Sequence, residues 1–100
     1  MDVDDLLKTL SHPVRREVIR YFEERPDQTT ASLEELVAHL ESLDPRNTSD
    51  GLWKTLYQVH LPTLQSQGWL AFDTERETVS YYGNEEAEAL IWEVYAIFKK

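Results

Sequence analysis

Residues 49–67 predict one amphipathic helix, and two runs that favour β-strands follow it directly. At about 100° per residue, one broad arc of this helix gathers its apolar, aromatic and histidine side chains: Leu52, Trp53, Leu56, Tyr57, His60, Leu61 and Leu64. The other side gathers polar side chains and a proline: Lys54, Thr55, Gln58, Pro62, Gln65 and Ser66. The runs 69–73 and 78–82 are rich in aromatic and β-branched residues and enclose a polar turn, so they predict a β-hairpin. We therefore expect the first face of this helix to pack against the core and the second to look outward, beside a small hairpin.

Two residues govern the shape and the end of this helix. Gly68 is expected to end it, because glycine adopts the left-handed conformation with the least strain. Pro62 lies inside it, where it removes one backbone hydrogen bond and its ring presses on the carbonyl group of Gln58, four residues earlier. We therefore expect the helix to bend at Pro62 or to break into two.

The rest of the chain predicts four more helices. Leu6, Leu7 and Leu10 have the spacing of one helical face and predict a short amphipathic helix over 5–10. A second helix is expected to start near Pro13 and to end before residue 26. Residues 27–31 predict a loop or one very short strand. A capping box formed by Ser32 and Glu35 predicts the start of a third helix, with each side chain satisfying a free backbone N–H. A last helix is expected after Asn84.

The composition is acidic. Lys and Arg total 10 against 19 Asp and Glu, which gives a formal net charge of −9, whereas nucleic-acid-binding domains usually carry a basic surface. The chain has no cysteine, which excludes disulfides and thiolate metal sites. No apolar run approaches the roughly 20 residues of a membrane span. The first residues are acidic where a secretory signal would be basic, so we expect a cytoplasmic protein with no membrane partner.

The order of elements and two motifs point to one fold. Two consecutive helices, the second with an outward polar face, followed by a hairpin, are typical of a winged helix-turn-helix domain. The residues from Leu10 to Ile19 resemble the opening helix of ArsR-like transcriptional regulators, and those from His60 to Leu70 resemble the end of their recognition helix and the entry to their wing. The chain as a whole resembles a group of haloarchaeal winged-helix domains of unassigned function, through the segment Tyr57 to Leu64 with its proline.

We therefore expect a mainly α fold with a small β-hairpin: a single winged helix-turn-helix domain over residues 1–100. Its predicted parts are an N-terminal helix (1–10), a helical core with the helix-turn-helix (13–68), the wing hairpin (69–82) and a C-terminal dimerisation helix (84–100).

The resemblance also implies a cause for the negative charge. Haloarchaeal proteins work in molar potassium salt, and resemblance to them implies an acidic surface with few lysines, of which this chain has Lys8, Lys54, Lys99 and Lys100. In such salt the Debye length is about 3 Å, so repulsion between an acidic protein and DNA is largely screened. Attraction to phosphates weakens as well, so DNA binding would depend on shape, base contacts and dimerisation.

The candidate DNA-binding residues lie on the polar side of the helix and on the hairpin turn. Lys54 and Arg76 are candidates for phosphate contacts, and Thr55, Gln58 and Gln65 for hydrogen bonds to base edges in the major groove. Residues 50–82 contain two basic and four acidic residues, a net charge of 2 − 4 = −2. The alternative is therefore that this side is simply a solvated helix face.

The candidate dimer residues come from the two terminal helices. The last helix carries a broad apolar stripe, and in ArsR-like regulators the terminal helices build the dimer, so the resemblance implies the same role here for Leu6, Leu7, Leu90, Ile91, Trp92, Val94, Tyr95 and Phe98. A two-fold dimer would place two reading helices about 34 Å apart, one turn of DNA. Alternatively, the last helix folds back on its own core.

Other charged and polar groups favour structural roles. Arg15, Arg16, Arg20 and Arg25 could meet a phosphate backbone, but pairing with the glutamates Glu17, Glu23 and Glu24 is favoured. His60 is expected to be buried, neutral and hydrogen-bonded to backbone, and its spacing from His12 and His39 fits no metal site.

No motif of an enzyme is present: the chain lacks a glycine-rich phosphate loop, a Gly-x-Ser-x-Gly elbow and a cysteine nucleophile. We therefore predict a dimeric transcriptional regulator that binds double-stranded DNA, is adapted to high salt and needs no cofactor. The alternative is a winged-helix module that binds another protein and never touches DNA.

Overall fold

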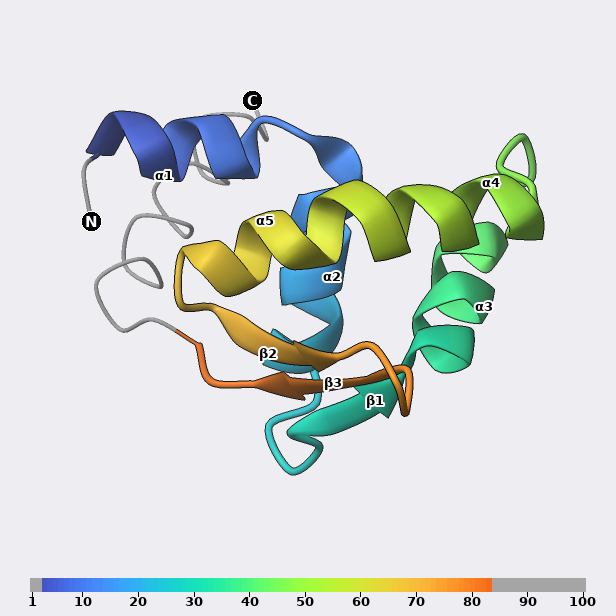
Figure 1. Ribbon diagram of the computed structural model, residues 1–100. Coiled ribbons are helices and arrows are strands. Elements are labelled where there is room, and N and C mark those ends of the chain that lie inside the picture. The colour runs from blue at the N-terminus through green and yellow to red at the C-terminus, as the bar shows by residue number, and fades with distance from the viewer. Residues whose placement is uncertain (1–2, 84–100) are drawn as a thin grey trace.

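A computed structural model describes residues 3–83, apart from the side chains of Val3 and Leu6. The predicted C-terminal helix, and with it most of the candidate dimer residues, lies outside this range. The described part is mainly helical with a small antiparallel sheet (Figure 1). Its elements are α1 (Val3–Leu10), α2 (Pro13–Glu23), β1 (Thr30–Ser32), α3 (Leu33–Leu43), α4 (Ser49–Thr55), the π-helical turn η1 (Leu56–His60), α5 (Leu61–Ser66), β2 (Leu70–Asp73) and β3 (Thr78–Tyr81).

The sheet has three strands in the order β1-β3-β2, and both pairings are antiparallel. The expected hairpin is present as β2 and β3, with Phe72 opposite Val79. The short strand β1 adds to the other side of β3, where Ala31 pairs with the same Val79. The sheet is thus larger than a hairpin alone, because the polar tract before α3 pairs with it.

Helix starts follow the expected capping residues in part. The backbone N–H of Glu35 donates to the Ser32 hydroxyl oxygen at 3.0 Å, which confirms Ser32 as the N-cap of α3. The Glu35 carboxylate instead accepts from the Gln28 side-chain amide at 3.3 Å, so only half of the predicted capping box carries the helix start. Pro13 occupies the first turn of α2, where its missing N–H costs nothing.

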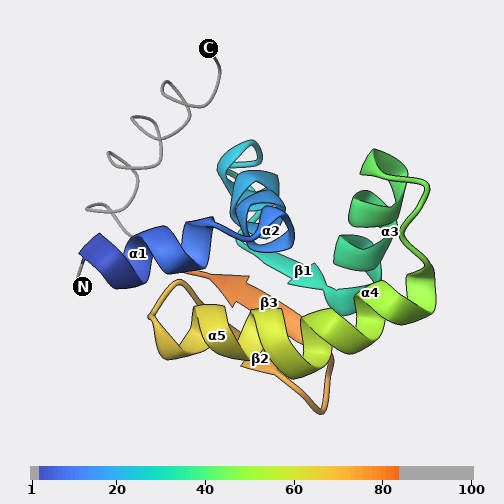
Figure 2. The ribbon, with the colours of Figure 1, turned by 90° about the horizontal axis from the view of Figure 1, so that it is seen from above.

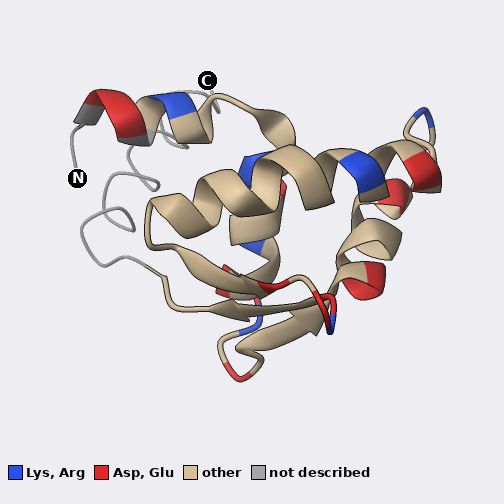
Figure 3. Ribbon diagram, in the orientation of Figure 1, with Lys and Arg blue, Asp and Glu red and all other residues tan. Residues whose placement is uncertain are grey.

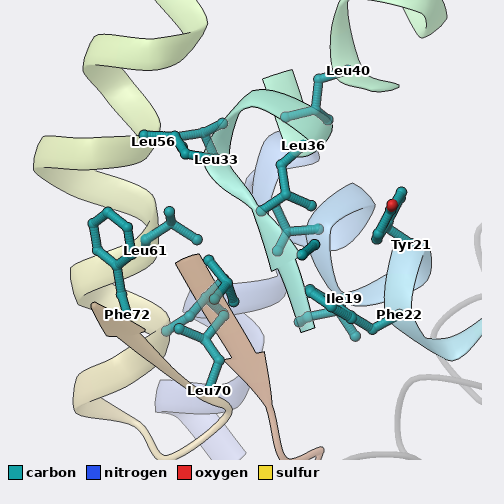
Figure 4. Close-up of a cluster of buried hydrophobic side chains, with 14 of the residues drawn as sticks. Ile19, Tyr21, Phe22, Leu33, Leu36, Leu40, Leu56, Leu61, Leu70 and Phe72 are labelled. Atoms are coloured by element: carbon teal, nitrogen blue, oxygen red, sulfur yellow. The ribbon is translucent and has the colours of Figure 1, made fainter. Parts of the chain in front are cut away.

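The core lies between the helices and one face of the sheet (Figure 4). Side chains from α2, α3, the η1–α5 segment and β2 point into it, and Phe22, Leu36 and Leu56 are each at most 2% exposed. The Phe22 ring stacks nearly parallel on Tyr81 of β3, with ring centroids 4.9 Å apart. Burial of this single cluster ties the last long helical segment and the hairpin to the first helices.

The segment from α4 to α5 follows one helical path beside β2 (Figures 1 and 2). One of the two predicted alternatives, a break into two helices at Pro62, is therefore wrong. Instead η1 precedes the proline, and the Leu61 backbone N–H donates to the carbonyl oxygen of Leu56, five residues earlier. A wider turn directly before the proline accommodates the irregularity that a proline inside a helix imposes, so the helix continues with one irregular turn.

Gly68 ends this helical segment, as predicted. Its φ is +81°, a conformation that side-chain-bearing residues adopt only with strain. The Trp69 backbone N–H then donates to the carbonyl oxygen of Leu64 at 3.1 Å. The chain turns at once into β2, so the outward face of the helix and the hairpin are held next to each other.

Candidate nucleic-acid interface

The outward side of the segment 49–66 is formed by the residues that the sequence placed there. All six polar-side positions are exposed: Lys54, Thr55, Gln58, Pro62, Gln65 and Ser66. The buried stripe is narrower than predicted and consists of Leu52, Leu56, His60, Leu61 and Leu64, each at most 4% exposed. The prediction was wrong for Trp53 and Tyr57, which are each 37% exposed. They lie on the edge of the stripe, where the neighbouring elements cover them only in part.

These two aromatic side chains form a row on the outward side. Trp53 and Tyr57 are four residues apart, the spacing at which side chains lie next to each other on a helix. The Tyr57 ring also meets Phe72 of β2 edge-on, with ring centroids 5.5 Å apart. Val59 is a further 47% exposed apolar residue in the same turn. The outward side is therefore aromatic and polar, with little charge, and the hairpin holds Tyr57 in place.

Two long polar side chains form a second row beside the aromatic one. Lys54 and Gln58 are also four residues apart. Within residues 3–83, neither the Lys54 ammonium nor the Gln58 amide has a hydrogen bond or an ion pair. The Thr55 hydroxyl, in contrast, donates to the carbonyl oxygen of Gly51 at 2.8 Å, so its proton is already used. Lys54 and Gln58 thus keep their full hydrogen-bonding capacity for a partner.

Gln65 has a structural contact that the sequence did not indicate. Its side-chain oxygen accepts a hydrogen bond from the Phe72 backbone N–H at 2.6 Å and ties α5 to β2. Nearby, the Thr9 hydroxyl bonds the side-chain oxygen of Gln67 and ties α1 to the end of the same segment. Only the packed fold brings these partners together, so helix periodicity gave no signal for them. The side-chain oxygen of Gln65 is therefore already bonded to Phe72, and the predicted contact with a base falls to its side-chain NH₂ group.

The turn between β2 and β3 is held by internal hydrogen bonds and is mainly acidic (Figure 3). One Asp73 carboxylate oxygen accepts the backbone N–H groups of Glu75 and Arg76, both at 3.1 Å. The Arg76 Nε lies 4.0 Å from the other Asp73 oxygen, and its side chain is 84% exposed. Glu77 closes the turn with a left-handed φ of +52°. Arg76 therefore projects from the turn, but it is the one basic residue beside three acidic ones in residues 73–77.

The first two arginines of α2 hold the end of α1. The Arg15 Nε donates to the carbonyl oxygen of Thr9 at 2.9 Å, and the Arg16 Nη1 donates to that of Leu10 at 2.8 Å. A helix end leaves such carbonyl groups without partners, and cationic donors are favoured there. Their structural role is as expected, but for Arg16 the expected glutamate partner is wrong, because the angle between α1 and α2 brings backbone oxygens closer.

The other two arginines are also engaged within the fold. Arg20 pairs with Glu24 at 2.7 Å and with Glu17 at 3.7 Å, as the helical spacing predicted. Arg25 donates to the carbonyl oxygen of Tyr21 at 2.9 Å and lies 4.1 Å from the centre of its ring. The densest basic group of the sequence is therefore used internally.

His60 contacts His12 at the junction of α2 and η1. Their ring centroids lie 4.2 Å apart, and His60 is only 4% exposed. Burial, followed by the charges of His12 and Arg15, lowers the pKa of His60 to about 4, so the ring is neutral as predicted. The expected backbone hydrogen bond is missing at its Nδ1, which has no partner within residues 3–83. Burial and two neighbouring arginines, Arg15 and Arg16, also lower the pKa of His12.

The remaining predicted sites are only partly visible. Of the candidate dimer residues, Leu7 is described and is 46% exposed, while the side chain of Leu6 and residues 90–98 fall outside the described part. Across the described residues, no group of three or more His, Asp or Glu side chains could hold a metal ion. The helices within 3–83 are all too short or too polar to cross a membrane.

Comparison with known proteins gives a family and no functional precedent. No curated protein and no solved structure matches the chain. One family model does match, over residues 7–80, a range that includes all the described elements except the start of α1 and the last residue of β3. The chain therefore belongs to the family described as a domain of unknown function, DUF7344.

Proposed function

We propose that the chain is a winged helix-turn-helix domain that binds double-stranded DNA as a homodimeric transcriptional regulator in the cytoplasm. The order of elements supports this proposal: α2 and α3 precede the helical segment from α4 to α5, and the hairpin β2–β3 follows it. In helix-turn-helix domains the second helix of the motif lies in the major groove. The corresponding element here is the segment 49–66. The role is one of binding, without a cofactor and without catalysis.

One observation carries the proposal. Lys54 and Gln58 project from the outward side of this segment with no intramolecular partner within residues 3–83, whereas the arginines of α2 are all engaged in the fold. A phosphate and a base edge are the groups that an ammonium and a primary amide bind in DNA. Lys54 and Gln58 therefore fit the major groove of DNA, where Lys54 would position the helix on a phosphate and Gln58 would contact a base edge.

The acidic charge of −9 limits how such binding can work. Lys54 and Arg76 are the candidate phosphate contacts of one protomer, and each neutralised phosphate contributes a slope of about −0.9 to log K against log salt. The proposal therefore predicts a shallow dependence of about −2 per protomer. Adaptation to molar salt, which the proposal includes, fits a protein whose affinity comes mainly from close contacts.

A second candidate function has its own observation. Trp53, Tyr57 and Val59 expose apolar surface on the same outward side, at 37%, 37% and 47%. Aromatic residues are enriched at protein interfaces. This favours, as the alternative, a winged-helix module that docks another protein through the same side.

The deciding experiment is a titration of a mixed duplex DNA library with the full chain over a range of KCl concentrations, followed by fluorescence anisotropy. We expect saturable binding that the double variant Lys54→Glu with Gln58→Glu abolishes. Lys8→Glu with Ser11→Glu is the matched control, because it makes the same total charge change on exposed residues at the end of α1 and directly after it. Absence of binding at every salt concentration would reject the DNA proposal in favour of the alternative.

A further inference from the structure

The π turn before Pro62 changes which side chains the helix presents. Tyr57, Gln58 and Val59 are consecutive and all exposed. In a turn with five-residue hydrogen bonding, each residue rotates only slightly less about the axis than in an α-helix, so Tyr57 and Val59 lie on the two flanks of Gln58. The exposed set therefore has an amide at its centre and one apolar side chain on each flank.

The chemistry of this set matches one kind of base pair. In the major groove adenine presents the N7 acceptor and the N6 donor, which a glutamine amide binds with two hydrogen bonds, and thymine presents a methyl group to apolar side chains. Guanine is read mainly by arginine or lysine. The segment 49–66 contains no arginine, and its one lysine, Lys54, lies a full turn before Gln58. The centre of the exposed set therefore lacks the usual guanine reader.

We propose that Gln58 reads an adenine in the major groove and that Tyr57 and Val59 contact the methyl groups of neighbouring thymines, so that the domain selects A·T pairs opposite η1. This inference rests on the proposed DNA-binding function. Two features of the free protein favour this role. The Gln58 amide has no competing partner within residues 3–83, and the Tyr57 ring packs edge-on against Phe72, with ring centroids 5.5 Å apart. A preorganised contact loses less side-chain freedom on binding.

The test is selection from a library of randomised duplexes by the purified full chain in molar KCl, with sequencing of the bound pool. We expect A·T pairs to be enriched at adjacent positions of each half-site. Gln58→Ala should lower affinity for the selected site by about 5- to 150-fold and remove the preference at a single position. Gln58→Glu should shift that position towards cytosine, because a carboxylate accepts from the cytosine amino group.

Ser66→Ala is the control, because Ser66 is exposed at the end of the same segment and its hydroxyl donates only to the carbonyl oxygen of Thr63 within residues 3–83. It should leave the selected sequence unchanged. Circular dichroism of each variant checks that it folds. A bound pool without A·T enrichment, or a preference that no Gln58 variant alters, overturns the inference while leaving DNA binding intact. If no duplex is retained at all, both this inference and the proposed function fail.

Discussion

Acidification from pH 7.5 to 5.0 should weaken the fold through His60. The pKa of this histidine falls from 6.5 to about 4 on folding, mainly because the ring is buried. A group whose pKa is lowered on folding binds a proton more readily in the unfolded chain. The contribution of neutral His60 to the free energy of unfolding is therefore fully present above pH 6.5. It decreases as the pH falls from 6.5 towards 4.

The size of this effect follows from the shift. Each pKa unit corresponds to about 1.4 kcal/mol, so the full difference is about 3 kcal/mol below both values. At pH 5.0 the unfolded histidine is almost fully protonated and the folded one almost neutral, and the loss in the free energy of unfolding is about 2 kcal/mol. His12, whose pKa is also lowered, adds to the loss with the same sign.

Urea titrations at both pH values, at constant KCl and followed by tryptophan fluorescence, measure this loss. Trp69 is fully buried, so its emission reports unfolding. His60→Leu should reduce the difference between the two pH values by about 2 kcal/mol. At pH 7.5 it should cost little, because the Nδ1 of His60 has no partner within residues 3–83 to lose. His39→Gln, which keeps both rings of the pair, is the control. An unchanged pH difference in His60→Leu would show that protonation of His60 does not cause the loss.

Two further predictions concern the packing and the end of the same helical segment. Leu56→Ala should lower the free energy of unfolding by about 2–5 kcal/mol in urea titrations, because Leu56 is 0% exposed, whereas Val59→Ala, at an exposed position of the same turn, should change it by less than about 0.5 kcal/mol. Equal losses would contradict the assigned burial. Gly68→Ala should lower the melting temperature and cost about 1–2 kcal/mol through its φ of +81°, although an added Cβ meets no atom within 4 Å. A neutral effect would show that the turn relaxes.

Local patterns predicted the elements well. Aromatic and β-branched residues around a polar turn located the hairpin, and Ser32 and Gly68 marked a helix start and a helix end at the observed positions. These features depend on a few neighbouring residues, so the sequence carries them directly. The same logic located the exposed polar row with Lys54 and Gln58.

Features that depend on tertiary packing were not predictable in the same way. The width of the buried stripe depends on what covers the helix, so Trp53 and Tyr57 were assigned to the wrong side. The partners of Arg16 and Gln65 are backbone groups of other elements, which helix periodicity cannot indicate. Pro62 indicated an irregularity, but whether it becomes a break or a π turn depends on how η1 and α5 pack on the core.

In the proposed complex, the outward side of the segment 49–66, next to the hairpin, contacts DNA. Chemical-shift mapping of the ¹⁵N-labelled chain with a bound duplex in high KCl tests it most directly. We expect the largest changes at the backbone amides of Lys54, Tyr57 and Gln58 and in the turn 74–77. Changes confined to α2 and α3, or none with any duplex, would contradict it.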